Sequence, residues 1–206
     1  TITNQPSDGG AALTITQELG PKSAAAHDPI SINGNAELDA FCSGNDTDGT
    51  KSNPHVIEGY EINASAANGI SLSNTDLYLI VRNCTITNGD LNSYNGIDLY
   101  NCTNVNITNN ELTENDFGIY LTDSSNHNTI SENNASNNTN GIYLRGRNNY
   151  NTVSGNTASN NEENGIFLFG SENTTVWCNT VSNNEENGIY LLGSKHTTIL
   201  GNTASN

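Results

Sequence analysis

Several residue types that stabilise ordinary globular proteins are scarce in this chain. Its 206 residues include no methionine, one tryptophan and four prolines, and only 33% are hydrophobic. No apolar run approaches the roughly 18 residues that a membrane-spanning helix needs, so we exclude such a segment. A composition this polar favours disorder unless the few apolar residues follow a regular pattern.

Positively charged residues are also scarce in this chain. Six Lys and Arg residues stand against 22 Asp and Glu, which gives a net charge of −16. Phosphate backbones and anionic lipids repel so acidic a chain, and we therefore exclude nucleic acids and anionic membranes as partners. The sequence starts without Met and shows no signal peptide, so we expect a mature form whose leader has been removed.

A repeated tetrad, Gly-Ile-x-Leu, dominates what is present. Its copies follow one another at intervals of 27, 22, 23, 24 and 23 residues, and they begin at Gly69, Gly96, Gly118, Gly141, Gly165 and Gly188. Alternation of apolar and other residues indicates a strand whose alternate side chains share a face. A fixed period built from strand-length pieces is typical of a solenoid. The sequence therefore predicts an all-β parallel β-helix, or solenoid, of about 22–24 residues per coil.

The repeat also predicts what each position does. We expect one inward column, stacked at the spacing of about 4.8 Å between strands, of Ile97, Ile119, Ile142, Ile166 and Ile189. A second inward column comprises Ile107, Ile130, Val153, Val176 and Ile199. Two asparagine columns mark corners where stacked amides form hydrogen-bonded ladders: Asn110, Asn133, Asn156, Asn179 and Asn202, and then Asn115, Asn138, Asn161 and Asn184.

The chain divides into three parts. Residues 1–29 do not fit the repeat and form an N-terminal extension and linker, in which residues 1–16 are a candidate exchanged strand. Residues 30–66 form an N-terminal cap with a short helix at residues 36–41, and residues 67–206 form the parallel β-helix. The repeat stops in mid-pattern, so either the chain has been cut or something covers the last coil, and we expect a second subunit to cover it.

The repeat resembles a known family. Across residues 96–206 runs the pattern Asn-x-Thr-Ile/Val-Ser-x-Asn-x-Ala/Val-Ser-x-Asn-x-x-Gly-Ile-Tyr-Leu, which resembles NosD-type right-handed parallel β-helix repeats. Residues 43–60 resemble the start of such domains in archaeal secreted surface proteins. The resemblance implies a single-stranded right-handed parallel β-helix. It leaves function open, because this fold hosts lyases, hydrolases, epimerases, adhesins and envelope proteins.

An extracellular or cell-surface location is the best prediction. Eight Asn-x-Ser/Thr sequons are candidate glycosylation sites: Asn45, Asn63, Asn83, Asn101, Asn106, Asn134, Asn137 and Asn173. A chain this rich in Asn, Ser and Thr also produces sequons by chance. The four cysteines are too scattered for a zinc site, and one or two disulfides are predicted among Cys42, Cys84, Cys102 and Cys178. Cys84 takes a ladder position and should be buried; a Cys42–Cys84 bridge is one option for the connectivity.

Clustered carboxylates are the candidate metal site. Glu162, Glu163, Glu185 and Glu186 occupy the same turn of adjacent coils, where hard oxygen ligands could hold calcium. The alternative is a solvated turn, which is also the leading interpretation of the Asp46-Thr-Asp48-Gly49 loop. We expect no other cofactor.

Catalytic motifs are fragmentary. Asn74-Thr75-Asp76 matches one motif of polygalacturonase-like enzymes without its partners, and glycoside hydrolysis needs paired carboxylates. Asn53-Pro54-His55 resembles the Asp-Pro-His of alginate C5-epimerases but has Asn in place of the acid. Arg145 and Arg147 flank one coil without an acidic cluster. We therefore predict that the chain is not an enzyme.

The outer surface offers a further signal. The outward residue of each tetrad becomes aromatic along the chain, as Ser71, Asp98, Tyr120, Tyr143, Phe167 and Tyr190 follow one another. Large apolar residues gather on the last coils and form a predicted assembly interface: Phe167, Phe169, Trp177, Tyr190, Leu192 and Leu200. The sequence thus favours an extracellular structural protein that assembles with copies of itself in an envelope, sheath or filament. The alternative is a carbohydrate-active or carbohydrate-binding β-helix, or adhesin, that uses the outer Tyr column as a platform for surface glycans.

Overall fold

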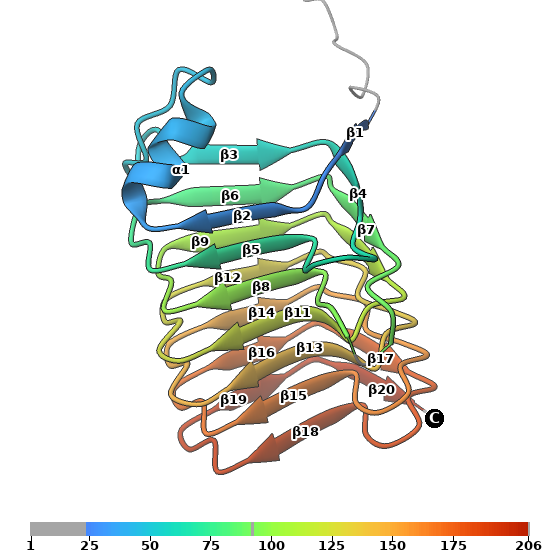
Figure 1. Cartoon of the computed structure of the whole chain (residues 1–206). Coiled ribbons are helices and arrows are strands. Elements are labelled where there is room, and N and C mark those ends of the chain that lie inside the picture. The colour runs from blue at the N-terminus through green and yellow to red at the C-terminus, as the bar shows by residue number, and fades with distance from the viewer. Residues whose placement is uncertain (1–23, 92, 206) are drawn as a thin grey trace, which may run out of the picture.

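The computed structural model describes residues 24–91 and 93–205, which form a solenoid of three parallel sheets (Figure 1). Sheet I contains β2 (Ile30–Asn33), β5 (Ile70–Ser73), β8 (Ile97–Tyr100), β11 (Phe117–Thr122), β13 (Asn140–Arg145), β15 (Ile166–Phe169) and β18 (Ile189–Leu192). Sheet II contains β3 (His55–Glu58), β6 (Leu79–Arg82), β9 (Val105–Thr108), β12 (Thr129–Ser131), β14 (Thr152–Ser154), β16 (Thr175–Trp177) and β19 (Thr198–Leu200). The predicted fold class is confirmed.

Sheet III is less regular than the other two. It starts with β1 (Ala25–His27), β4 (Tyr60–Asn63), β7 (Thr85–Thr87) and β10 (Glu111–Thr113), and it ends with β17 (Thr180–Ser182) and β20 (Thr203–Ser205). Single parallel bridges at Asn134 and Thr157 join its two parts. In the coils of these two bridges the inward side chains are short: Ala135 and Ala158 are buried where the earlier coils bury Ile86 and Leu112.

The predicted inward column of sheet I is confirmed. Ile97, Ile119, Ile142 and Ile166 pair in register from coil to coil and are fully buried, and Ile189 packs partly buried against them. The residue between Ile and Leu faces outward in every coil, as the alternation predicted. No coil could bury these side chains alone, so each coil depends on its neighbours.

The sheets begin before residue 67, within the segment that the sequence assigned to the cap. Ile30–Asn33 pairs with Ile70–Ser73, and His55–Glu58 pairs with Leu79–Arg82. The helix α1 (Asn35–Cys42) lies at this end of the stack and buries Leu38 and Cys42 (Figure 1). A helix at residues 36–41 was predicted, and α1 confirms it with one more residue at each end.

One local expectation near the N-terminus was wrong, because residues 25–27 form strand β1 against β4 instead of a linker. Ile57 and Ile62 are both buried, although strict alternation would put them on opposite faces. The chain turns at Gly59, where φ is +71°, and this turn resets the alternation between β3 and β4. The candidate exchanged strand at residues 1–16 lies outside the described residues.

Both predicted asparagine ladders are present. Asn133 shows the pattern: its backbone N and its Nδ2 each donate to Oδ1 of Asn156 at 3.0 Å, and Nδ2 also donates to the backbone O of Ile107 at 2.9 Å. Asn115 donates to Asn138 in the same way. Each amide thus joins its coil to both neighbours. Cys84, buried at a ladder position as predicted, donates its backbone N–H to Asn110 Oδ1.

A third ladder was not anticipated. At the corner between sheets I and II, the backbone N of Val105 donates to Asn128 Oδ1, and the backbone N of Asn128 donates to Asn151 Oδ1. The residue before a ladder asparagine turns the chain with positive φ, as at Asn109 (+55°) and Cys178 (+55°). Asn tolerates this conformation better than most residues, which accounts for much of the composition.

The predicted disulfides are not formed, because all four cysteines are free thiols. Cys42 Sγ lies 3.9 Å from the carbonyl oxygen of Val56, whereas Cys84 Sγ lies 3.4 Å from the carbonyl oxygen of Arg82. The two thiols of the suggested Cys42–Cys84 bridge therefore contact different backbone carbonyls. Burial raises the pKa of the Cys42, Cys84 and Cys102 thiols, which keeps them neutral and unreactive. Within the described residues, no helix has the length and apolar character needed to cross a bilayer.

The substitution Ile142→Asn should unfold the central coils. It removes about 2–3 kcal/mol of burial and leaves an amide without partners in the core. Urea denaturation followed by circular dichroism measures the loss. Thr152→Asn, on the outer face of β14, is the control and should change stability by less than about 0.5 kcal/mol. Equal stability of Ile142→Asn and wild type would show that this column is not the core.

Asn156→Ala tests the ladder separately from the apolar core. The change removes the acceptor of two Asn133 N–H groups and the donor to the Ile130 carbonyl. Groups left unpaired in a buried site cost about 1–3 kcal/mol each, so we expect a loss of several kcal/mol in the same urea experiment. The neighbouring exposed change Thr157→Ala should have little effect. Similar midpoints for both variants would contradict a stabilising role for the ladder.

Candidate functional site

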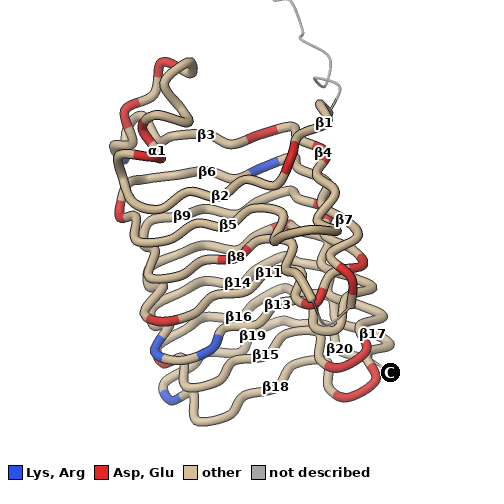
Figure 2. The backbone as a smooth tube through the Cα atoms, viewed as in Figure 1, with Lys and Arg blue, Asp and Glu red and all other residues tan. Residues whose placement is uncertain are grey.

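The acidic residues are spread over turns on several sides of the solenoid and are not gathered at one point (Figure 2). In the described part of the chain, no group of three or more His, Cys, Asp or Glu side chains is placed to hold a metal ion. Glu162, Glu163, Glu185 and Glu186, the candidate calcium ligands, do not form such a group. The Glu163 carboxylate instead accepts from Asn140 Nδ2 at 2.8 Å, and Glu186 accepts from Asn164 Nδ2 at 3.2 Å.

The Asp48 loop is likewise a local turn. Oδ1 of Asp48 accepts from the backbone N and from Oγ1 of Thr50, at 3.0 and 2.7 Å. These bonds lower the pKa of the Asp48 carboxyl, the side-chain bond being the larger cause. The carboxylate is thus occupied in shaping its own loop.

The fragmentary catalytic motifs are not brought together. Asp76 accepts from Asn35 Nδ2 at 2.7 Å and joins the turn after β5 to the start of α1. His55 is buried and bridges two elements, with Nε2 2.8 Å from Asp39 Oδ1 and Nδ1 2.8 Å from Thr47 Oγ1. Its bonds hold the loop after α1 in place. Arg145 lies at the end of β13, remote in sequence from both motifs and exposed.

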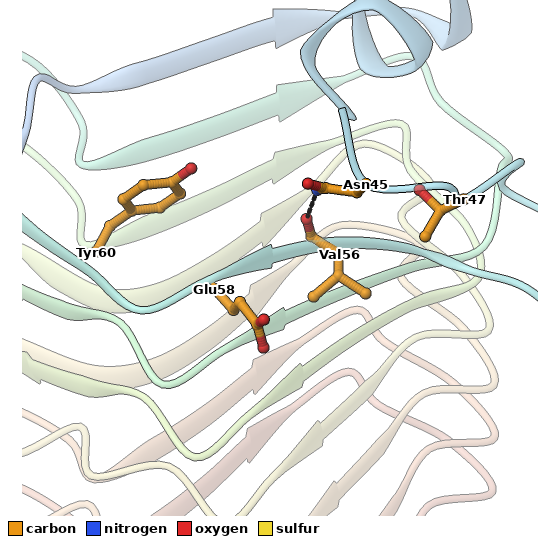
Figure 3. Close-up of a pocket in the computed structure, with 5 residues that line it drawn as sticks. All are labelled: Asn45, Thr47, Val56, Glu58 and Tyr60. Carbon is orange, nitrogen blue, oxygen red and sulfur yellow. Dashed lines mark hydrogen bonds between the residues drawn. The ribbon is translucent and has the colours of Figure 1, made fainter. Parts of the chain in front are cut away.

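A small pocket of about 220 Å³ lies between this loop and β3 (Figure 3). Asn45, Thr47, Val56, Glu58 and Tyr60 line it, and Asn45 Nδ2 donates to the Val56 carbonyl at 3.1 Å. Glu58 accepts from Arg82 Nε at 2.7 Å, so the one carboxylate in the pocket already has a cationic partner. These contacts indicate a structural junction between the loop and sheet II.

The outer face of sheet I carries the features most suited to binding. Its second half bears an aromatic ladder, defined as Phe117, Tyr120, Tyr143, Phe167 and Tyr190. The Tyr143 and Phe167 rings stack with centroids 4.5 Å apart and planes 6° apart, and Phe167 and Tyr190 stack at 4.8 Å and 22°. Phe117 and Tyr120 also stack, at 4.6 Å and 25°, so most rings have a face covered by a neighbouring ring. The ladder therefore stabilises the sheet and offers few free ring faces to a sugar.

The predicted interface residues are mostly exposed. Phe169, Trp177, Tyr190, Leu192 and Leu200 expose between 36% and 65% of their surface. Phe167 is half-buried within the ladder. Phe169 and Leu192 extend the column of Tyr100, Thr122 and Arg145 on sheet I. Trp177 and Leu200 extend that of Thr108, Ser131 and Ser154 on sheet II.

The first half of the same face holds a groove of about 500 Å³ that the sequence did not reveal. Its lining comprises Pro29, Ile30, Ser31, Ala67, Asn68, Ser71, Ser93 and Tyr94. Ser31 and Ser71 are outward residues of β2 and β5, and Asp98 is the next residue in their column. The signal that could have found this groove is the first interval of 27 residues, since its extra length precedes Ser93 and Tyr94, which line the groove.

Burial raises the pKa of the Asp98 carboxyl from 3.8 to about 6, although Asn68 Nδ2, which donates to Asp98 Oδ2 at 3.0 Å, opposes the shift. Burial also raises the pKa of Asp116, and the nearby charge of Glu163 adds to the effect. A carboxyl that titrates near neutrality beside a groove can donate as well as accept a hydrogen bond.

The sequons differ in exposure. Asn45, Asn63, Asn83, Asn101 and Asn137 are exposed, whereas Asn106, Asn134 and Asn173 are half-buried. Their modification stays a prediction.

Asp98→Asn should change how stability depends on pH. Because the folded state binds the Asp98 proton more tightly than the unfolded chain, its contribution is fully present below about pH 4 and is lost as pH rises through about 6. The loss is at most about 3 kcal/mol and smaller after solvent screening. Urea midpoints should therefore favour the variant over wild type more at about pH 7 than at about pH 4. A difference that stays constant with pH would contradict the raised pKa.

Comparison with known proteins supports the fold. Two mutant crystal structures of the periplasmic alginate epimerase AlgG are similar, one with a TM-score of 0.65 and 22% identity over 74% of this chain, the other with 0.62 and 23% over 68%. The chain spans only about a third of the length of these structures, 36% and 32%. At this identity the likeness shows the fold alone. No curated protein sequence matches.

The family described as "Right handed beta helix region" matches residues 43–204, most of the chain. The match fixes the hand of the solenoid, which agrees with the general preference for right-handed parallel crossovers. The chain belongs to the right-handed beta helix family.

Proposed function

We propose that this chain is an extracellular structural protein, without enzymatic activity, that assembles with copies of itself in a cell envelope, sheath or filament. The observation that carries the proposal is that large exposed apolar side chains occupy the same outer column on both of the last two coils, on sheet I and again on sheet II. On sheet II, Ser131 and Ser154 are followed by Trp177 and Leu200. Exposed apolar columns of this kind mark protein–protein contacts more often than solvent-facing surface.

The distribution of charged residues favours a second copy of this chain as the partner of the apolar surface. Arg145 ends β13 and pairs with Phe169 of the next coil, Arg147 lies on the turn after β13, and Lys195 lies on the turn after β18, which ends at Leu192. The cap at the other end of the molecule is acidic, with Glu37, Asp39, Asp46 and Asp48 against Lys51. The chain therefore offers both a basic, apolar surface and an acidic one, and such complementarity steers association and fixes orientation.

The features that support the proposed cell-surface location come from the sequence. The repeats resemble the NosD type, and residues 43–60 resemble the start of such domains in archaeal secreted surface proteins. Five exposed sequons and a very acidic surface fit that location. The right-handed helix by itself hosts many functions and supports no choice among them.

Carbohydrate binding is the second candidate, and the groove beside Asp98 favours it. The similar solved structures are alginate epimerases by name, so an uronate polymer is one substrate class to test. The aromatic ladder does not strengthen this candidate, because its ring faces are covered.

Substitution of the apolar columns should weaken self-association. We expect Phe169→Ser with Leu192→Ser, and separately Trp177→Ser with Leu200→Ser, to raise the dissociation constant at least about tenfold, which corresponds to 1.4 kcal/mol. Light scattering over a concentration series measures the particle mass. Tyr100→Ser removes an exposed ring from the same column on an early coil and is the matched control. Wild-type protein that stays monomeric throughout the series would overturn the proposal.

A further inference from the structure

The groove on sheet I is preformed. Its outer wall includes Ser93 and Tyr94, whose backbone N–H groups donate to Asp90 O at 2.9 Å and to Gly89 O at 2.8 Å. The Tyr94 carbonyl then accepts from Asp116 N at 2.9 Å, which fixes this wall to the next coil. Gly89 permits this arrangement, since a Cβ there would lie 2.3 Å from the Tyr94 carbonyl oxygen. A site that is already ordered loses less entropy when a ligand binds.

The groove presents the chemistry of a hydroxyl-rich ligand. Ser31, Ser71 and Ser93 bring hydroxyls that both donate and accept, and Asn68 brings an amide. Tyr94 adds an aromatic wall, and Pro29 and Ala67 add apolar surface. The volume of about 500 Å³ falls in the range of small-ligand sites, which combine apolar walls with a few polar groups.

The charged residues around the groove further restrict the class of ligand that it can bind. Among the described residues, the groove lining contains no Lys or Arg, and the residue that continues the groove floor is Asp98. Of the basic residues that the structure describes, Arg82 lies on sheet II and is paired with Glu58, and Arg145 lies two coils beyond Asp98. Among the described groups that line the groove or continue its floor, a polyanion would meet the Asp98 carboxyl and no cation, in a chain of net charge −16. Repulsion of this kind selects against anionic ligands.

We propose that the groove formed by Ser31, Asn68, Ser71 and Tyr94, with Asp98 at its edge, binds an uncharged oligosaccharide and discriminates against uronate chains. The hydroxyls, the amide and Asp98 pair with sugar hydroxyls, while Tyr94 packs against a sugar ring. This inference rests on the second candidate function and is independent of self-association.

The test is calorimetric titration of the full chain with neutral trisaccharides of glucose, mannose and galactose, and with trigalacturonate and trimannuronate as the anionic arm. We expect at least one neutral sugar to bind at least about tenfold more tightly than either uronate. Binding of no sugar in the panel, or equal binding of both classes, would overturn the proposal.

Ser71→Tyr should block the groove while keeping the fold, because Tyr120 and Tyr143 occupy the same column on later coils. The matched control is Ser73→Tyr, whose column carries Tyr100 on the next coil. Affinity should fall at least about tenfold for the first variant and change little for the second. Unchanged affinity in Ser71→Tyr would refute the location.

Tyr94→Ala provides an independent check, since Tyr94 supplies a side chain to the groove and its backbone bonds do not need the ring. Affinity should again fall at least about tenfold, and an unaltered value would count against the site even if Ser71→Tyr failed to fold. Light scattering of the same samples separates the two proposals, because groove variants should leave the particle mass unchanged.

Discussion

Everything in this molecule depends on hydrogen bonding along the solenoid axis. A coil of some two dozen residues cannot bury its own backbone or its few apolar side chains. The neighbouring coils therefore supply both the hydrogen bonds and the apolar contacts. The strands supply the bonds along the sheets, and the asparagine amides supply them at the corners, where the backbone alone would leave donors unpaired. The Asn133 side chain, for example, is hydrogen-bonded both to Ile107 in the preceding coil and to Asn156 in the next.

This constraint leaves function to the outer faces. The interior consists of stacked columns and corner ladders, and the described residues place no metal-binding group there. Sheet I then divides into two regions along its length. A hydroxyl-lined groove lies over the early coils, where the outward residues are Ser31, Ser71 and Asp98, and a covered aromatic stack with exposed apolar neighbours lies over the late ones. The two proposals made above concern these separate regions.

Sequence alone predicted the part of the structure that repeats. The columns through Ile142 and Asn156, the outward residues of the tetrad and the burial of Cys84 all follow from a fixed period, since stacking turns spacing along the chain into adjacency in space. It failed outside the repeat, where residues 25–27 form strand β1 instead of a linker. Within the repeat it did not predict that Glu163 and Glu186 accept hydrogen bonds from asparagines of the preceding coil.

The groove escaped prediction for a related reason. Part of its wall comes from a single irregular insertion, and its floor adds Ser31, which belongs to no repeated tetrad, to Ser71 and Asp98 of the predicted outward column. Only the structure places Ser31 and the insertion beside that column. Features made by repetition can be inferred from one copy, whereas features made by an exception to it require the structure.

The ladders have a consequence for how such a chain can vary. Asn133 bonds to Asn156 and Asn156 bonds to Asn179, each 23 residues apart, so consecutive rungs are interchangeable. Loss or duplication of one complete coil joins equivalent rungs and preserves every axial contact, while loss of a few residues shifts all later ones out of register. Length in this architecture can therefore change in whole coils, which would lengthen or shorten the molecule without redesigning its core.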